Sequence, residues 1–263
     1  MISQKFAVLT LVAMVAFAAN SVLCRFALEK GQMDPLLFTL IRLGSGGLVL
    51  MLITRNFRFK SVLNGPTLCM SFMLFAYALF FSFAYQTLST GTGALIIFSA
   101  IQITMFAGGI CQGERPNLLT FLGMAIAIAG LGGLVYPSLS LPSRSGAFFM
   151  GISGVTWGIY SLLGQKAKNP QRTTAANFSA AFILALVAGA FFKVLGGPFE
   201  SSFARPDPFT LGAALASGAV ASAGGYVVWY RALQDLLAVQ AALVQMSVPI
   251  LASLGGIFFY QSL

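Results

Sequence analysis

The chain has 263 residues, of which 58% are hydrophobic and only 8% are charged, and its mean hydropathy is +0.88. A soluble domain carries about 25% charged residues, so this composition excludes one and predicts an outer surface that lies mostly in lipid. The net charge is +9, but in a membrane protein the basic residues set the orientation, and no nucleic-acid partner is expected.

Apolar segments separated by charged or Pro- and Gly-rich joints predict the transmembrane helices. A helix needs roughly 20 apolar residues to cross a bilayer. Nine segments of about this length follow in chain order: 6–28, 35–53, 66–87, 91–112, 117–136, 146–165, 174–195, 209–231 and 237–259. Transmembrane strands would alternate over about ten residues, unlike these continuous runs. The predicted fold class is an all-α polytopic membrane protein that forms one bundle.

The first segment also fits a secretory signal peptide. Lys5, the apolar run 6–15 and the small residues Ala16 and Ala18 match the pattern of a basic region, an apolar core and a cleavage site. Because the internal repeat described below uses this segment as a structural helix, we interpret it as the first span.

Lysine and arginine residues in the short joints predict the orientation, since cytoplasmic loops carry their excess. With a cytoplasmic N-terminus, nine of these residues lie inside and four outside. The inside set includes both dense clusters, Arg55/Arg58/Lys60 and Lys166/Lys168/Arg172. We therefore expect a multi-pass protein of the cell inner (plasma) membrane with its N-terminus in the cytoplasm.

The two halves of the chain are related by an internal repeat. The segments that align are 17–27 with 157–167, 85–88 with 230–233, and the Gly-Gly-Ile triplets 108–110 and 255–257. Equivalent helices are five spans apart, an odd number, so the second copy enters the membrane from the opposite side. Such inverted repeats are typical of secondary transporters. The prediction is an inverted repeat of five-helix units, 1–136 and 146–263, with five and four spans present and a tenth expected beyond Leu263.

Short motifs occur in a fixed order along nearly the whole chain. They are Ala19-Asn20-Ser21 followed by Arg25, Asp34-Pro35 with Leu40-Ile41-Arg42, Gly113-Glu114-Arg115, Trp157-Gly158 and Gln245-Met246-Ser247-Val248-Pro249. In this order they resemble the EamA-type family of the drug/metabolite transporter superfamily. The resemblance implies a ten-helix carrier with a five-plus-five inverted repeat that moves amino acids, metabolites or drugs. The family's tenth helix has no counterpart before Leu263.

Polar and aromatic residues near the middle of spans are the candidates for a solute-binding cavity. Arg42 lies inside the second span, where a charge normally faces protein or a water-filled cavity. Its side chain is expected either to bind an anionic part of the solute or to act as a hydrogen-bond hub between helices. The other candidates, which line the cavity or bond between helices, are Asn20, Tyr77, Gln102, Trp157, Tyr160 and Gln245.

Other residues have expected roles in pairing, bending or anchoring. Arg25 is expected to reach the interface or to pair with Glu29 one helical turn later. Residues that can loosen a helix are candidate hinges, with plain packing as the alternative: Pro249, Gly91 and Gly224. Aromatic residues near span ends are assigned to the interfacial belt: Tyr85, Tyr136, Trp229, Tyr230 and Tyr260.

The residue types that are missing exclude several functions. The chain has no histidine, no acidic residue in the middle of a span and no Gly-x-x-x-x-Gly-Lys phosphate loop. Histidine-based catalysis, zinc sites of the His-Glu-x-x-His type and ATP hydrolysis are therefore excluded, and no enzyme activity, metal or cofactor is expected. Coupling to an ion would have to pass through Glu29 or Glu114, which lie near the joints.

The sequence therefore predicts a secondary carrier that moves a small organic solute by alternating access across a central cavity between two inverted halves, with export as the expected direction. A membrane channel, or a structural membrane protein without carrier activity, is the alternative. The expected partners are the lipid bilayer and the solute, with a homodimer left open.

Overall fold

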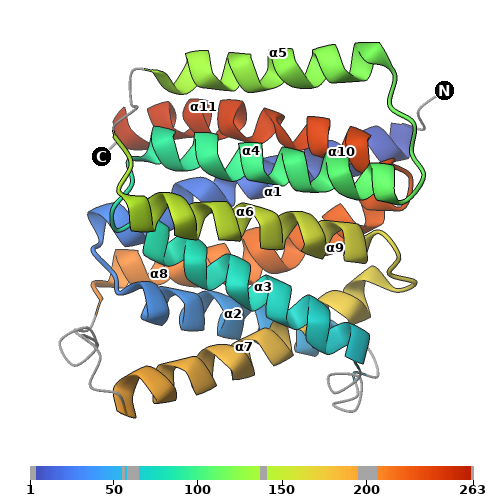
Figure 1. Cartoon of the computed structure of the whole chain (residues 1–263). Coiled ribbons are helices and arrows are strands. Elements are labelled where there is room, and N and C mark those ends of the chain that lie inside the picture. Colours follow the sequence, from blue (N-terminus) through green and yellow to red (C-terminus); the bar gives the residue numbers. More distant parts are fainter. Residues whose placement is uncertain (1–3, 55–56, 58–64, 137–140, 195–205, 262–263) are drawn as a thin grey trace.

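The described part of the chain folds into helices only, and the computed structural model describes residues 4–54, 57, 65–136, 141–194 and 206–261. Nine helical runs follow one another within these ranges and alternate in direction (Figure 1). They are α1 (Gln4–Arg25) continued by η1 (Phe26–Lys30), α2 (Pro35–Ile53), α3 (Gly65–Ala84), α4 (Thr90–Cys111), α5 (Leu118–Val135), α6 (Arg144–Gly164), α7 (Pro170–Val194), α8 (Pro208–Ala216) continued by η5 (Ser217–Ser222) and α9 (Ala223–Leu233), and α10 (Ala238–Gln245) followed by α11 (Ser247–Gln261). Each run overlaps one of the nine predicted segments.

Eight of these helical runs, among the described residues, are long and apolar enough to cross a membrane. The run that falls short is α5, whose 18 residues span about 27 Å at a rise of 1.5 Å per residue, against roughly 30 Å of bilayer hydrocarbon. Large apolar side chains point outward around the bundle, including Leu52, Leu119 and Val220 at 77%, 77% and 71% exposure. Such a surface is stable in lipid, which confirms a multi-pass membrane protein.

Side-chain caps mark where several helices begin, because the first backbone N–H groups of a helix need acceptors. Asp34 caps α2, Ser89 caps α4, Asn117 caps α5 and Ser143 caps α6. Asp207 caps α8 and accepts hydrogen bonds from the side chain and the backbone of Thr210. These bonds favour the ionised carboxylate, so the pKa of Asp207 lies below its usual value.

Two helical runs contain irregular segments in their interior. The eighth run changes to π-helix over η5 (Ser217–Ser222), a form that is frequent at functional sites. The ninth run breaks at Met246, whose N–H bonds Leu243 O at 3.1 Å. Pro249 explains this break, because a proline removes one helical hydrogen bond and its ring collides with the carbonyl four residues earlier, which belongs to Gln245. The candidate hinge residue Pro249 therefore lies three residues after a break in the helix.

Helix α6 lies between α3 and α4 and packs against both (Figure 1). Its glycines allow the close approach to α4: a Cβ at Gly154 would meet Ile97 O at 2.6 Å, and one at Gly158 would meet Thr104 Cβ at 2.8 Å. Helix α5 lies at the edge of the bundle beside α4 (Figure 1). The basic cluster Arg55/Arg58/Lys60, used for the orientation, lies outside the described residues.

Candidate solute-binding cavity

A cavity of about 300 Å³ lies between the two repeats. Its walls come from α1, η1, α3, α4 and α5 of the first repeat and from α6, α9, α10 and α11 of the second. Ligand pockets in proteins start at about this size. Many of its lining side chains are aromatic: Phe17, Tyr77, Phe81, Tyr85, Phe98, Trp157 and Tyr226.

Aromatic rings form the deep part of the cavity. The centroid of the Trp157 ring lies 4.8 Å from those of Tyr77 and Tyr226, and Phe17 meets Trp157 edge-on at 5.4 Å. The indole Nε1 of Trp157 donates to Gln245 Oε1 at 2.7 Å, which joins α6 to α10. An apolar solute body would find stacking surfaces here, with the single indole N–H already bonded within the protein.

Asn20 connects the cavity wall to the π-helical segment. Its Oδ1 accepts from Ser217 Oγ at 2.7 Å, from Ser222 Oγ at 3.2 Å and from Cys24 Sγ at 3.6 Å. Because three donors occupy this oxygen, the amide N–H group of Nδ2 is what Asn20 can offer to a solute.

Arg42 lies behind the cavity wall and is only 1% exposed. Its Nε donates to Ser222 Oγ at 3.0 Å, and its Nη2 donates to Tyr226 OH at 2.7 Å and to Tyr77 OH at 3.4 Å. The guanidinium carbon also lies 5.3 Å from the Tyr77 ring centroid, within the range of a cation–π contact. Arg42 is thus a hydrogen-bond hub that joins α2, α3, η5 and α9.

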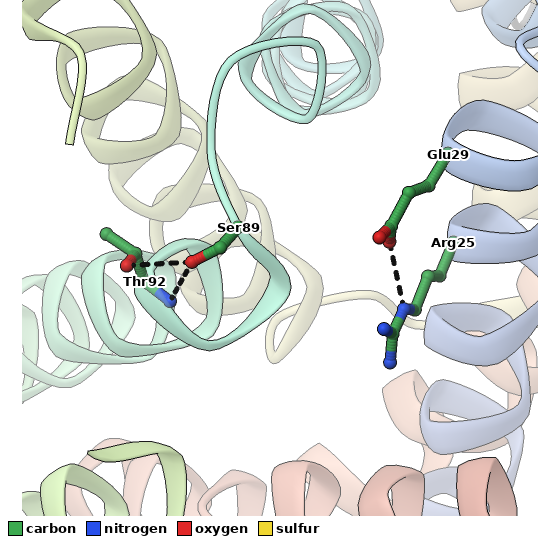
Figure 2. Close-up of polar contacts among 4 residues, drawn as sticks. All are labelled: Arg25, Glu29, Ser89 and Thr92. Carbon is green, nitrogen blue, oxygen red and sulfur yellow. Dashed lines mark hydrogen bonds and ion pairs between the residues drawn. The ribbon is translucent and has the colours of Figure 1, made fainter. Parts of the chain in front are cut away.

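Charged and polar residues surround the open end of the cavity, which we call the Arg25 end. Arg25 Nε bonds Glu29 Oε2 at 2.9 Å, so the expected pairing one turn apart is confirmed. Both side chains line the cavity, as does Ser89 on the opposite wall. Figure 2 shows the Arg25–Glu29 pair on the α1–η1 helix and the Ser89–Thr92 hydrogen bonds at the start of α4.

Direct contacts close the opposite end of the bundle, which we call the Gln165 end. Gln165 Nε2 donates to Leu236 O at 2.5 Å, and Gln234 Nε2 donates to Ala167 O at 2.7 Å. Deeper in the same region, Tyr230 OH donates to Tyr160 O at 3.2 Å and Trp229 Nε1 donates to Ser161 Oγ at 3.3 Å. These bonds tie α6 and the loop after it to α9 and the loop after α9.

The structure brings together most of the predicted site residues and separates others. Six line the cavity: Asn20, Tyr77, Trp157, Gln245, Gly91 and Pro249. Arg42 lies behind the cavity-lining residues Tyr77 and Tyr226, whose hydroxyls it contacts. Gln102 is buried and donates to Ala242 O at 2.5 Å. Tyr160 belongs to the closed Gln165 end, and Gly224 is exposed on the outside of α9, where a Cβ would meet nothing within 4 Å.

The interfacial-belt interpretation is wrong for three aromatic residues. Trp229 and Tyr230 are fully buried and bond within the protein, and Tyr85 lines the cavity. Tyr136 is 75% exposed, as a belt residue would be, and the side chain of Tyr260 lies outside the described set. Proximity to a span end in sequence cannot tell a lipid-facing helix side from one that packs on a neighbouring helix.

Phe17 and Tyr226 are among the cavity residues that were not predicted. Phe17 belongs to the segment that aligns with Trp157 in the internal repeat. That equivalence was a usable signal, because it places both rings at the same depth in the two halves. Tyr226 follows the π-helical segment, which changes the side of the helix that faces the cavity. No sequence pattern indicates that change.

An all-helical, multi-spanning bundle with a cavity between two related halves defines a transporter-like membrane protein. The chain matches the EamA-like transporter family twice, over residues 4–136 and 144–262. It belongs to this family, and the two matches show a duplicated helical unit, with five helical runs described in the first copy and four in the second.

Several known proteins are similar to this chain over most of its length. An uncharacterized protein of Pseudomonas aeruginosa is 43% identical over 94% of this chain and 84% of its own length. A protein of Archaeoglobus fulgidus described as an uncharacterized transporter is 29% identical over 73% of this chain and 66% of its own length. A solved crystal structure superposes with a TM-score of 0.76 over 96% of this chain and 88% of the other, at 18% identity, which demonstrates a shared fold.

Proposed function

We propose that the protein is a secondary carrier of the inner (plasma) membrane that exports a small organic solute by alternating access, with its N-terminus in the cytoplasm. The observation that carries the proposal is the cavity between the repeats, which reaches the Arg25 end and is closed by hydrogen bonds at the Gln165 end. A cavity accessible from one side only is what a carrier presents in one of its two states.

The internal repeat supports two such states of similar energy. Tyr230 OH bonds Tyr160 O at the closed end, and the repeat equates these residues with Tyr85 and Asn20. Both equivalents line the cavity at the open end. No hydrogen bond between Asn20 and Tyr85 corresponds to this contact in the described first half, which fits two inverted halves that exchange conformations.

The closed Gln165 end also favours a carrier over a channel. A channel conducts through a continuous path lined by polar groups, whereas here buried Trp229, Tyr230 and Tyr160 fill the bundle below the cavity. A structural membrane protein would need neither the cavity nor its polar lining.

Solute flux into proteoliposomes tests the proposal. Purified protein is reconstituted and assayed by counterflow with radiolabelled amino acids, organic acids and other metabolites. We expect saturable flux of at least one solute class. Trp157→Ala should abolish this flux, because it removes the central aromatic ring of the cavity lining. Phe148→Ala is the matched control, since Phe148 lies on the same helix and is 65% exposed. Absence of flux for the whole panel, or equal loss in both variants, would contradict the carrier. Assays in right-side-out and inverted vesicles then test export.

A further inference from the structure

Arg42 carries a buried positive charge that has no opposite charge beside it among the described residues. The ion pair formed among the described residues is Arg25–Glu29, and it does not include Arg42. The polar partners of the Arg42 side chain are three neutral hydroxyls. Its Nη1 is buried and has no hydrogen-bond partner. Burying an unpaired charge is strongly unfavourable, so an anion near Arg42 would compensate a cost that the protein alone leaves uncompensated.

The groups between Arg42 and the cavity are arranged to donate hydrogen bonds. Tyr77 and Tyr226 line the cavity, and each phenol oxygen accepts from Arg42 Nη2. The two hydroxyls also interact with each other, so at least one phenol hydrogen remains for another acceptor. The Nδ2 group of Asn20 adds a further donor on the same wall. A donor-rich wall backed by a cation matches an anionic acceptor, because hydrogen bonds to charged groups are shorter and stronger than neutral ones.

We infer that Asn20, Tyr77 and Tyr226, with Arg42 behind them, form a subsite for the anionic group, of the carboxylate type, of the transported solute. The adjoining rings of Phe17 and Trp157 then hold the apolar body of that solute. This inference rests on the proposed carrier function and specifies its substrate class: small organic anions or zwitterions with an apolar body. The same chemistry would also accept a free inorganic anion such as chloride.

Ligand-induced stabilisation of the purified full chain tests the subsite. The melting temperature Tm is measured against concentration for matched pairs of carboxylate and amide, such as phenylacetate with phenylacetamide and acetate with acetamide, and for sodium chloride alone. Binding to the folded state raises Tm. We expect carboxylates to raise Tm and their amides to have little effect.

Substitutions then locate the binding. Arg42→Gln should weaken carboxylate binding by about tenfold or more, since charged hydrogen bonds are lost, and Arg42→Lys should restore part of it. Tyr226→Phe and Tyr77→Phe, which keep the ring, should each weaken it severalfold. Arg144→Gln and Tyr136→Phe are the matched controls on exposed residues, and they should bind as the wild type does.

An Arg42-dependent shift with chloride alone that competes with phenylacetate supports the subsite and identifies an inorganic anion as its occupant. Equal binding of amides and carboxylates, unchanged binding in Arg42→Gln, or no Arg42-dependent shift with any anion overturns it. Counterflow separates this inference from the proposed function: flux without charge discrimination contradicts only the subsite, and Arg42-dependent binding without flux contradicts only the carrier.

Discussion

Glu114 illustrates how one side chain can organise a helix in the opposite repeat. It follows α4, and its Oε1 and Oε2 accept the backbone N–H groups of Ala238 at 2.6 Å and Val239 at 3.1 Å. These residues begin α10, whose preceding residue, Leu237, has no side-chain acceptor. The carboxylate therefore supplies the missing cap, and its charge is favourable at the positive end of the helix dipole.

This contact predicts that Glu114 contributes to stability and not to ion coupling. Glu114→Gln should lower the free energy of unfolding by about 1 kcal/mol, because the amide loses the charge and turns a donor toward a backbone N–H. The measurement is Tm in detergent. Asp235→Asn is the control, an exposed acidic residue beside the same helix start. An unchanged Tm combined with loss of pH-dependent transport would show instead that Glu114 is a coupling residue.

Individual residue roles were predictable where local geometry determines them. The Arg25–Glu29 pair follows from a spacing of four residues on one helix. For Arg42, the sequence left a hub and an anion-binding group open, since a buried charge permits either role. Its partners Ser222 and Tyr226 lie about 180 positions along the chain. Only the packing of α2 against η5 and α9 brings them together.

Helix–helix contacts in this bundle depend on small residues, because lipid gives helices no hydrophobic reason to associate and close packing must hold them together. Two glycines of α6 differ sharply in their surroundings. Gly154 faces α4, where an added Cβ would meet Ile97 O and Ala100 Cβ, both at 2.6 Å, whereas nothing lies within 4 Å of a Cβ at Gly151.

Alanine substitutions on α6 should therefore have opposite effects. Gly154→Ala should destabilise the protein by about 1–3 kcal/mol, because its Cβ forces α6 away from α4. Gly151→Ala on the same helix should be neutral or stabilising by up to about 1 kcal/mol, since alanine favours the helix more than glycine does. Thermal unfolding of the two variants in one detergent measures both effects. Equal Tm values would mean that α6 and α4 are not packed as described.

At the level of elements, the sequence predicted the existence and order of the helices because long apolar runs determine them. Pro249 was a candidate hinge with plain packing as the alternative, and the helix breaks three residues before it, at Met246. The π-helical segment η5 was not predicted, because a π-helix differs from an α-helix by one extra residue in a turn, and the Ser-Gly-Ala-Val-Ala-Ser sequence fits either. That segment turns Ser217 and Ser222 toward Asn20 and so contributes to the site.

The whole molecule is organised by the relation between its two repeats. Alignment of the repeats located the cavity between the halves but could not indicate which end is open, because an inverted pair has two equivalent arrangements and sequence does not favour one. The structure adopts the arrangement with the Gln165 end closed. If the protein works by the proposed alternating access, the register of the repeat, 17–27 on 157–167 and 85–88 on 230–233, predicts the contacts of the other arrangement.

Closing of the Arg25 end is the corresponding prediction. Gln165 bonds the backbone of Leu236 at the closed end. The repeat equates Gln165 with Arg25, and continuing the second aligned segment for three residues equates Leu236 with Gly91. Both equivalents now line the open cavity. In the state that opens the Gln165 end, residues 25 and 91 should therefore come into contact.

Paired cysteines test this exchange in a background with Cys24, Cys69 and Cys111 replaced. Gln165→Cys with Leu236→Cys, treated with a reducible bifunctional thiol reagent that spans the length of the replaced glutamine side chain, should cross-link readily and trap the arrangement described above. Arg25→Cys with Gly91→Cys should cross-link only when the other arrangement is populated, and a solute that favours one state should raise one yield and lower the other. Each cross-link should stop counterflow until it is reduced.

Because the two contacts belong to different states, both cannot form in one molecule of a four-cysteine variant. Simultaneous cross-linking of both ends, or active transport without any 25–91 cross-link, would exclude alternating access through these contacts.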